Sequence, residues 1–313
     1  MATEKAARGK TLSWINGSRE HGGSVLSSEC AGDRENQWTK IITPERAWFD
    51  IDLGALWRYR YLVRLFVLRD LVATYKQTIL GPAWFFISPL ITAVVFTFVF
   101  GTIAAIPTDG MPPFLFYLCG TVCWGQFSRC LVTTSSVFVD NSHIFGKVSF
   151  PRLAIPVATV ISSGAKFLVQ LVILLGFMIY FRSKGSPVAP NWWAPAVLFL
   201  GLQAGIIGMA AGILIASVTT KYRDLMFFVQ FGVQLWMYAT PVVYPLSQVP
   251  ERYGWFFLLN PMVAVVESFR LALLGTGGVG PLQMGMSVAF TILLLLAGLG
   301  SFNKTENTFM DRI

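Results

Sequence analysis

The stretch that decides the fold runs from residue 84 to residue 106 and reads WFFISPLITAVVFTFVFGTIAAI. It contains no charged side chain. A helix of this length, at about 1.5 Å per residue, covers the roughly 30 Å hydrocarbon core of a bilayer. The stretch therefore predicts a helix that crosses a membrane.

Five more apolar runs follow it. Hydrophobic residues make up 54% of the 313 residues and charged residues only 13%, against roughly 25% charged in soluble domains. We therefore expect an all-α integral membrane protein with about six transmembrane helices in a domain spanning residues 83–313. The expected crossings are residues 84–106, 114–139, 153–181, 192–218, 225–240 and 282–302.

The chain before the first crossing divides into two parts. Residues 1–50 are rich in Gly, Ser and charge without periodicity, which predicts a disordered cytoplasmic leader, with a docking tail as the alternative. Residues 51–82 predict an N-terminal amphipathic interfacial helix lying in the headgroup plane of the membrane. Packing on a soluble domain is the alternative, which the immediately following crossing disfavours. The expected apolar stripe is Tyr61, Leu65, Leu68, Val72, Tyr75 and Ile79.

Residues 242–275 are apolar in two short pieces, separated by Asn260 and Pro261. Neither piece is long enough to cross a bilayer alone. Broken backbone at membrane depth is tolerated only where protein or a water-filled cavity covers it. We therefore expect a re-entrant helical pair before the last crossing.

The net charge of +8 comes from Lys and Arg residues placed before and between the apolar runs. This distribution follows the positive-inside rule and differs from a basic module that binds nucleic acid. It predicts that both termini are cytoplasmic, which requires an even number of crossings. Arg182, Lys184 and Arg252 lie on the opposite side and are exceptions to the bias.

The sequence offers no catalytic constellation of its own. Gly146-Lys147 is followed by Val148 and lacks the earlier glycine of a phosphate-binding loop. No set of His, Cys, Ser and carboxylate residues is spaced for nucleophilic, acid–base or metal chemistry. Cys119, Cys123 and Cys130 share one helical face, for which apolar packing is favoured over a metal site. We therefore expect no cofactor, metal or catalytic residue on this chain.

Four ionisable residues fall at membrane depth, where facing lipid would be costly. Glu267 and Arg270 are three residues apart and can pair on one face, either as a local lock or as part of a gate. Arg129 suits contact with an anionic substrate. Lys166 either faces the interior or extends its ammonium to the interface.

Aromatic side chains are dense along the crossings. Rings stack on the apolar faces of sugars, so an aromatic passage suits a carbohydrate, whereas lipid contact is the alternative for any single ring. The glycines at 201, 205, 208 and 212 recur at helical spacing and predict close approach of another helix. The expected passage residues are Phe96, Trp124, Phe127, Arg129, Trp236 and Tyr238.

Several motifs occur together in a fixed order. This order closely resembles the membrane subunit of type-2 ABC exporters for polysaccharides, over roughly residues 55–313. The motifs are Arg69-Asp70-Leu71, residues 75–84 (YKQTILGPAW), Ser88-Pro89-Leu90, Asn141 with residues 147–152 (KVSFPR), Tyr222-Arg223-Asp224, residues 241–245 (PVVYP), Asn260-Pro261, residues 267–270 (ESFR), and the ending with Glu306, Phe309, Asp311 and Ile313.

The resemblance implies a homodimeric permease that pairs with two separate ATP-hydrolysing subunits, which bind the ATP and Mg. It implies outward movement of a lipid-linked glycan, such as O-antigen, capsule or teichoic acid, across the bacterial cytoplasmic (inner) membrane. Export of a drug or lipid and a polytopic glycan transferase are the alternatives. The resemblance assigns coupling to the ATPase subunits to Asn141, Lys147, Phe150, Pro151, Arg152, Arg69 and Asp70, and an external gate to Tyr244, Asn260, Pro261, Glu267 and Arg270.

Overall fold

The computed structural model describes residues 53–76, 81–145, 150–220, 222 and 224–310. Every regular element among these residues is a helix, so the predicted all-α class is confirmed. The predicted leader, residues 1–50, lies outside the described residues. The helices are α1 (Leu53–Arg58), α2 (Arg60–Lys76), α3 (Trp84–Phe96), α4 (Pro113–Ser135), α5 (Val137–Asp140), α6 (Ser142–Phe145), α7 (Ala154–Ser183), α8 (Ala196–Thr219), α9 (Leu225–Tyr238), α10 (Gly254–Leu259), α11 (Pro261–Leu274) and α12 (Pro281–Met310).

Among the described residues, four helical segments are long and apolar enough to cross a membrane. They are Trp84–Ile103, Ala154–Ser183, Ala196–Thr219 and Pro281–Phe302. The first joins α3 to a turn of π-helix, Thr97–Ile103. Among the other expected crossings, α9 has only 14 residues, and α4 is long but carries more polar residues. The count of about six therefore stays a prediction for these two helices.

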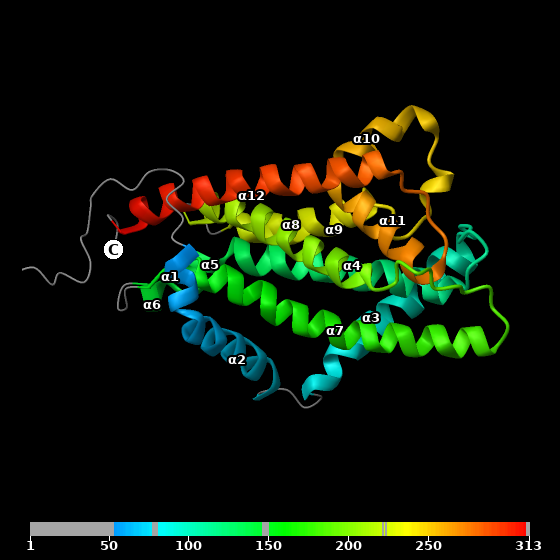
Figure 1. Cartoon of the computed structure of the whole chain (residues 1–313), viewed down its shortest axis with the longest axis horizontal. Coiled ribbons are helices and arrows are strands. Elements are labelled where there is room, and N and C mark those ends of the chain that lie inside the picture. Colours follow the sequence, from blue (N-terminus) through cyan, green and yellow to red (C-terminus); the bar gives the residue numbers. More distant parts are fainter. Residues whose placement is uncertain (1–52, 77–80, 146–149, 221, 223, 311–313) are drawn as a thin grey trace, which may run out of the picture. The chain divides into compact units, whose positions relative to one another are not determined.

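The helix α4 lies at the centre of the bundle. It packs against α7, α8, α3 and α11, while α12 covers α8 on the far side (Figure 1). Its side chains from Leu115 to Cys119 are almost completely buried. Because other helices surround α4, its polar residues need not face lipid, which explains why its composition is less apolar than that of its neighbours. Cys119, Cys123 and Cys130 are buried among these packed faces.

Glycines of α8 bring that helix against the backbone of α4. A Cβ atom on Gly212 would lie 2.7 Å from the carbonyl oxygen of Leu131, and one on Gly208 would overlap the carbonyl oxygen of Phe127. Thr219 then ties the ends of the two helices, donating from Oγ1 to the Ser135 carbonyl oxygen at 2.6 Å. The predicted close approach through small residues is confirmed.

The expected second run, residues 114–139, is divided between α4 and α5. The break follows four consecutive hydroxyl residues, and Ser135 and Ser136 turn their Oγ atoms back to the carbonyl oxygens of Val132 and Thr133. Such local bonds compete with helix continuation. Ser136 also donates to Asp140 Oδ2 at 2.6 Å, which holds the new turn. The chain thus leaves α4 earlier than hydropathy predicts.

The segment expected as one amphipathic helix is two helices, α1 and α2, interrupted at Tyr59. Val63 and Phe66 are buried on one side of α2 and pack on the bundle. Four residues of the predicted stripe, Tyr61, Leu65, Leu68 and Val72, lie on the other side and are exposed. The side chain of Tyr75 and all of Ile79 lie outside what the structure describes. Apolar exposure on one side and packing on the other fit a helix held between the bundle and a lipid surface.

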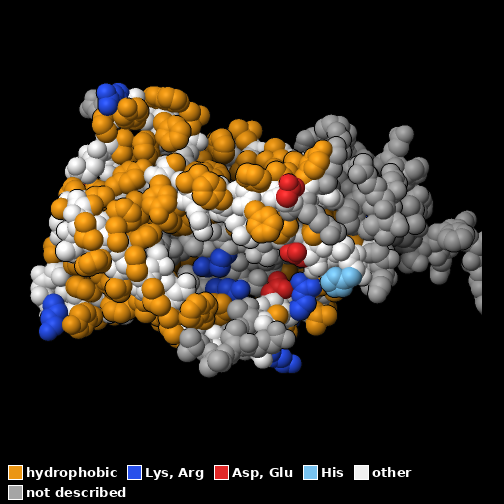
Figure 2. Space-filling model, turned by 180° about the vertical axis from the view of Figure 1, so that it is seen from behind, with side chains coloured by type: hydrophobic (Ala, Val, Ile, Leu, Met, Phe, Trp, Pro, Cys, Tyr) orange, Lys and Arg blue, Asp and Glu red, His pale blue; other side chains and the backbone are white. Residues whose placement is uncertain are grey.

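Figure 2 shows a broad apolar surface over one part of the molecule. Lys, Arg, Asp and Glu side chains gather beside it in a hollow. The lipid-length helices carry exposed apolar residues, such as Val172 and Ile179 of α7 and Leu293 of α12. An exposed apolar belt of this extent is expected where lipid replaces water as the solvent.

Candidate functional site

At one end of the bundle, Arg69 links α2 to the turn between α5 and α6. Its Nη1 donates to Asn141 Oδ1 at 3.2 Å, and its Nε and Nη2 donate to Asp70 Oδ1 at 3.1 and 2.9 Å. The guanidinium also lies 4.9 Å from the centre of the Phe66 ring. Asn141 is buried and secures the turn by donating from Nδ2 to the Val137 carbonyl oxygen. Three of the predicted coupling residues therefore meet at one point.

Aromatic rings join the same end into one cluster. Phe150 packs against Phe66 of α2 with ring centres 5.6 Å apart, and it stacks on Phe145 of α6 at 5.8 Å. Phe138 contacts Phe145 and also Phe302 of α12, at 5.9 and 5.0 Å. The cluster thus packs α2, the α5–α6 segment and α12 against one another.

The remaining predicted coupling residues differ in their placement. Arg152 is 5% exposed, and its guanidinium lies 5.3 Å from the centre of the Phe145 ring, so the charge is held within the protomer. Pro151 directs its carbonyl oxygen to the Ala154 N–H at 2.9 Å, at the start of α7. Lys147 lies outside the described residues. Contact of these residues with an ATPase subunit stays a prediction.

At the opposite end, Glu267 and Arg270 form a buried ion pair on α11. Arg270 Nη1 donates to Glu267 Oε1 at 2.9 Å, and both side chains are almost completely buried. Arg270 Nη2 donates to the Val242 carbonyl oxygen at 2.6 Å, and the guanidinium lies 3.8 Å from the centre of the Phe116 ring. One cation thus ties α11 to α4 and to the segment after α9.

Asn260 and Pro261 fix where α11 begins. Asn260 Oδ1 accepts from the Met262 N–H at 3.1 Å, as an N-cap, while its Nδ2 donates to Thr240 Oγ1 at 2.9 Å. The Pro261 carbonyl oxygen accepts from Ser287 Oγ of α12 at 2.8 Å. Tyr244, also predicted for the gate, donates from its hydroxyl to the Tyr238 carbonyl oxygen at 3.0 Å. The predicted gate residues therefore meet around the α10–α11 hairpin, and their gating role stays a prediction.

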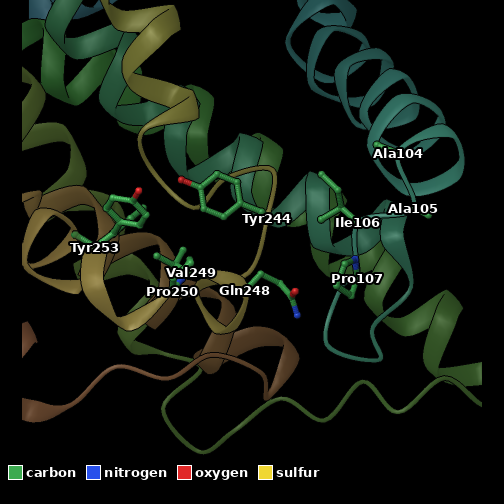
Figure 3. A pocket seen from close by; sticks show the side chains of 10 residues that line it. Ala104, Ala105, Ile106, Pro107, Tyr244, Gln248, Val249, Pro250 and Tyr253 are labelled. Atoms are coloured by element: carbon green, nitrogen blue, oxygen red, sulfur yellow. The ribbon is translucent and has the colours of Figure 1, made fainter.

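A pocket of about 500 Å³ lies beside this hairpin, and sequence reasoning missed it. Figure 3 shows the residues just after the first crossing, from Ala104 to Pro107, facing Tyr244, Gln248 and Tyr253. Its walls come from segments far apart in the sequence that carry no shared motif, so spacing alone could not reveal it. Two phenol rings and an amide beside apolar walls suit a ligand with both C–H and hydroxyl faces.

The predicted passage residues divide into two settings. Trp124, Phe127 and Trp236 form an aromatic cluster between α4 and α9, with ring centres 4.8 to 6.5 Å apart, and Phe127 is fully buried. Phe96 is buried against Phe100 and Tyr117. In contrast, Tyr238 is 48% exposed. Within one protomer the first four rings pack the interior, and a role in a passage stays a prediction.

Arg129 lies on α4 within reach of α7. Its Nη2 donates to Gln170 Oε1 at 3.2 Å, and Gln170 in turn donates from Nε2 to the Phe85 carbonyl oxygen at 3.0 Å. Lys166 of α7 lies over the Phe85 ring at 5.2 Å. Arg129 and Lys166, named separately from the sequence, therefore lie at one junction of α3, α4 and α7.

The segment that carries both groups of residues, from α2 to the end of α11, corresponds to a known family. Residues 61–274 match the family described as ABC-2 type transporter. The chain belongs to the ABC-2 type transporter family. The matched range includes the Arg69–Asn141 link, the central helices and the Glu267–Arg270 pair of this ABC-2 chain.

Relatives of this ABC-2 chain are named for glycan export. It is 26% identical over 255 residues to the O-antigen export system permease protein RfbA of Klebsiella pneumoniae, covering 80% of this chain and 95% of that protein. It is also 26% identical over 263 residues to the RfbA of Myxococcus xanthus, covering 82% and 97%. The polysialic acid transport protein KpsM of Escherichia coli is 22% identical over 255 residues, covering 79% and 95%.

Proposed function

We propose that this ABC-2 chain is the transmembrane subunit of an ATP-driven exporter that moves a lipid-linked polysaccharide, O-antigen or a similar glycan, across the bacterial cytoplasmic membrane. The observation that carries the proposal is the similarity to O-antigen export permeases over nearly their whole length. In the proposed complex two copies of the chain pair with two ATP-hydrolysing subunits. ATP and Mg are bound by those subunits, and both termini of this chain are cytoplasmic.

The surface of α9 supports a dimer with a passage between the copies. Of its residues only Val233 is buried. Gln230 and Gln234, one turn apart, are exposed beside Phe227 and Phe231. An amide that faces lipid has no hydrogen-bond partner and is costly. A face of amides and aromatic rings is instead suited to a glycan, whose hydroxyls and C–H groups it can contact.

The Arg69–Asn141 link supports the proposal that ATP hydrolysis acts on the α5–α6 segment. In the proposed mechanism the ATPase subunits push on the α5–α6 segment, and the Phe66–Phe150 contact transmits this to α2. At the far end the α10–α11 hairpin, held by Arg270, shifts to let the glycan leave. ATP biases the equilibrium only if the two states of this assembly differ in nucleotide affinity.

Purification and an export assay test the proposed function. A tagged chain extracted from its native membrane should bring with it a separate ATPase subunit in about equal amount. Deletion of the chain should leave lipid-linked glycan on the cytoplasmic side of the membrane, measured by its protection from a glycan-cleaving enzyme added outside intact cells. Export that continues without the chain, or a chain that transports without any ATPase, would reject the proposal.

A further inference from the structure

Two cations, Arg129 and Lys166, lie at one junction, and neither forms a salt bridge with a described residue. Both side chains reach the start of α3, Arg129 through its hydrogen bond to Gln170, which bonds the Phe85 carbonyl oxygen, and Lys166 through the Phe85 ring. Among the residues that the structure describes, no carboxylate lies within salt-bridge distance of either side chain. Asp70 of α2 is the carboxylate whose charge reaches Lys166, and it is already paired with Arg69 at 2.9 Å.

The guanidinium of Arg129 is only partly satisfied. Its Nη2 donates to Gln170, but its Nε is buried without a hydrogen-bond partner in the described structure. A buried charged donor without an acceptor is costly, and proteins rarely retain one without a use. Gly125, one turn earlier on α4, leaves room for the group, since a Cβ there would lie 3.0 Å from Arg129 Nη1.

Lengths along the helices indicate the depth of the junction if α4 and α7 enter the hydrocarbon core at Pro113 and Ser183. Arg129 lies about 24 Å along α4 from Pro113, at 1.5 Å per residue, and Lys166 lies about 25 Å along α7 from Ser183. Both therefore approach the far boundary of a roughly 30 Å hydrocarbon core. Phe85, which contacts both Gln170 and Lys166, belongs to the first turn of the first crossing, beside the exposed Trp84. Interfacial Trp residues mark this same level.

We propose that Arg129, Lys166 and Gln170 bind a phosphoryl group carried by a lipid at this level. This inference rests on the proposed function. It specifies the part of the substrate that this chain recognises, which is the phosphate or diphosphate that joins lipid and glycan. A phospholipid headgroup presents the same chemistry. Both side chains are partly exposed in the described structure, so a phosphoryl group can reach them from outside the bundle.

The three side chains suit this anion in complementary ways. A guanidinium presents parallel N–H donors that match two phosphoryl oxygens. The buried Nε of Arg129 lacks an acceptor, and a small shift of the guanidinium toward the phosphoryl group would give it one. The Lys166 ammonium supplies a second, compact charge. Gln170 holds the guanidinium in place through its Oε1 and is itself anchored to the Phe85 carbonyl oxygen. Sulfate-sized or larger oxyanions fit these donors, whereas a sugar hydroxyl would leave both charges uncompensated.

Binding of three probes to the full-length chain in detergent tests the site. The probes are farnesyl diphosphate, inorganic diphosphate and phosphatidylglycerol, with phosphatidylcholine as the background lipid. The variant R129Q/K166Q should bind farnesyl diphosphate at least about tenfold more weakly than the wild type. The matched control is Lys184→Gln, at the opposite end of α7. It should bind like the wild type.

The conservative variant R129K/K166R keeps both charges and tests whether a loss of binding comes only from a structural change. It should keep most of the affinity, and all variants should have thermal unfolding midpoints near that of the wild type. Weakened binding of farnesyl diphosphate alone assigns the site to the lipid carrier of the substrate. Weakened binding of phosphatidylglycerol as well assigns it to lipid phosphates in general. Unchanged binding of both, or equal loss in Lys184→Gln, overturns the phosphoryl site.

Failure of the proposed function gives a different result. If the wild-type chain brings no ATPase and exports no glycan, yet its binding of farnesyl diphosphate depends on Arg129 and Lys166, the phosphoryl site stands and the exporter proposal falls. If export proceeds and R129Q/K166Q binds all probes like the wild type, the exporter proposal stands and the phosphoryl site falls.

Discussion

Removing one charge of the Glu267–Arg270 pair should lower the stability of the protein more than removing both. Glu267→Gln leaves Arg270 buried and unpaired beside Phe116, and breaking one partner of a buried pair typically costs about 3–5 kcal/mol. The double variant E267Q/R270M leaves no uncompensated charge and should be closer to the wild type. Thermal unfolding in detergent measures the difference, with the exposed Arg252→Met as control. A double variant as unstable as the sum of the single variants would contradict this account.

The Arg69–Asn141 hydrogen bond makes a prediction about coupling. Arg69→Gln removes the charge that links α2 to the α5–α6 turn, so export should fall severalfold while the assembled complex still hydrolyses ATP. ATPase rate and glycan export, measured on the same membranes, give the ratio of the two activities. Arg60→Gln is the control on the same helix, because Arg60 contacts only its neighbours' rings, Trp57 and Tyr61, among the described residues. An unchanged ratio in Arg69→Gln would reject the link as a coupling element.

Among the helices, the contact between α4 and α8 leaves no room for a side chain at Gly212. Gly212→Ala places a methyl group 2.7 Å from the Leu131 carbonyl oxygen. The helices must separate, which typically costs about 1–3 kcal/mol. Gly176→Ala on α7 is the matched control, since a Cβ there meets nothing within 4 Å. Its unfolding midpoint should stay the same or rise slightly, because Ala favours a helix over Gly by up to about 1 kcal/mol. Equal midpoints for the two variants would contradict the close packing.

Elements with a strong local signal could be predicted from the sequence. The four lipid-length helices follow from hydropathy, and the start of α11 follows from Asn260-Pro261, because both signals act within a few residues. The end of α4 was missed, since the hydroxyls of Ser135 and Ser136 decide it through backbone bonds that hydropathy does not register. Burial of Arg152 was also missed, because its position over Phe145 depends on how α6 folds back.

The sequence indicates individual candidate residues, but it does not show which of them lie together. Arg129 and Lys166 lie on different helices with 36 intervening positions, and no periodicity links them. Their meeting depends on the packing of α4 on α7 and on the Gln170 bond to the start of α3. The ring cluster of Trp124, Phe127 and Trp236 likewise forms only when α9 packs on α4. Long-range contacts of this kind need the tertiary structure.

At the scale of the whole molecule, the exposed face of α9 predicts where two copies meet. Gln230 and Gln234 are exposed on one side of a helix that has only Val233 buried, and the proposed dimer places this side near its counterpart across the passage. A cysteine at position 234, in a chain that also carries Cys30→Ser, should cross-link between copies in native membranes with a short bifunctional reagent. A cysteine at position 179 of α7, where Ile179 is 71% exposed, should not. Denaturing gel electrophoresis measures the cross-linked fraction, and equal fractions for the two positions would place the dimer contact elsewhere.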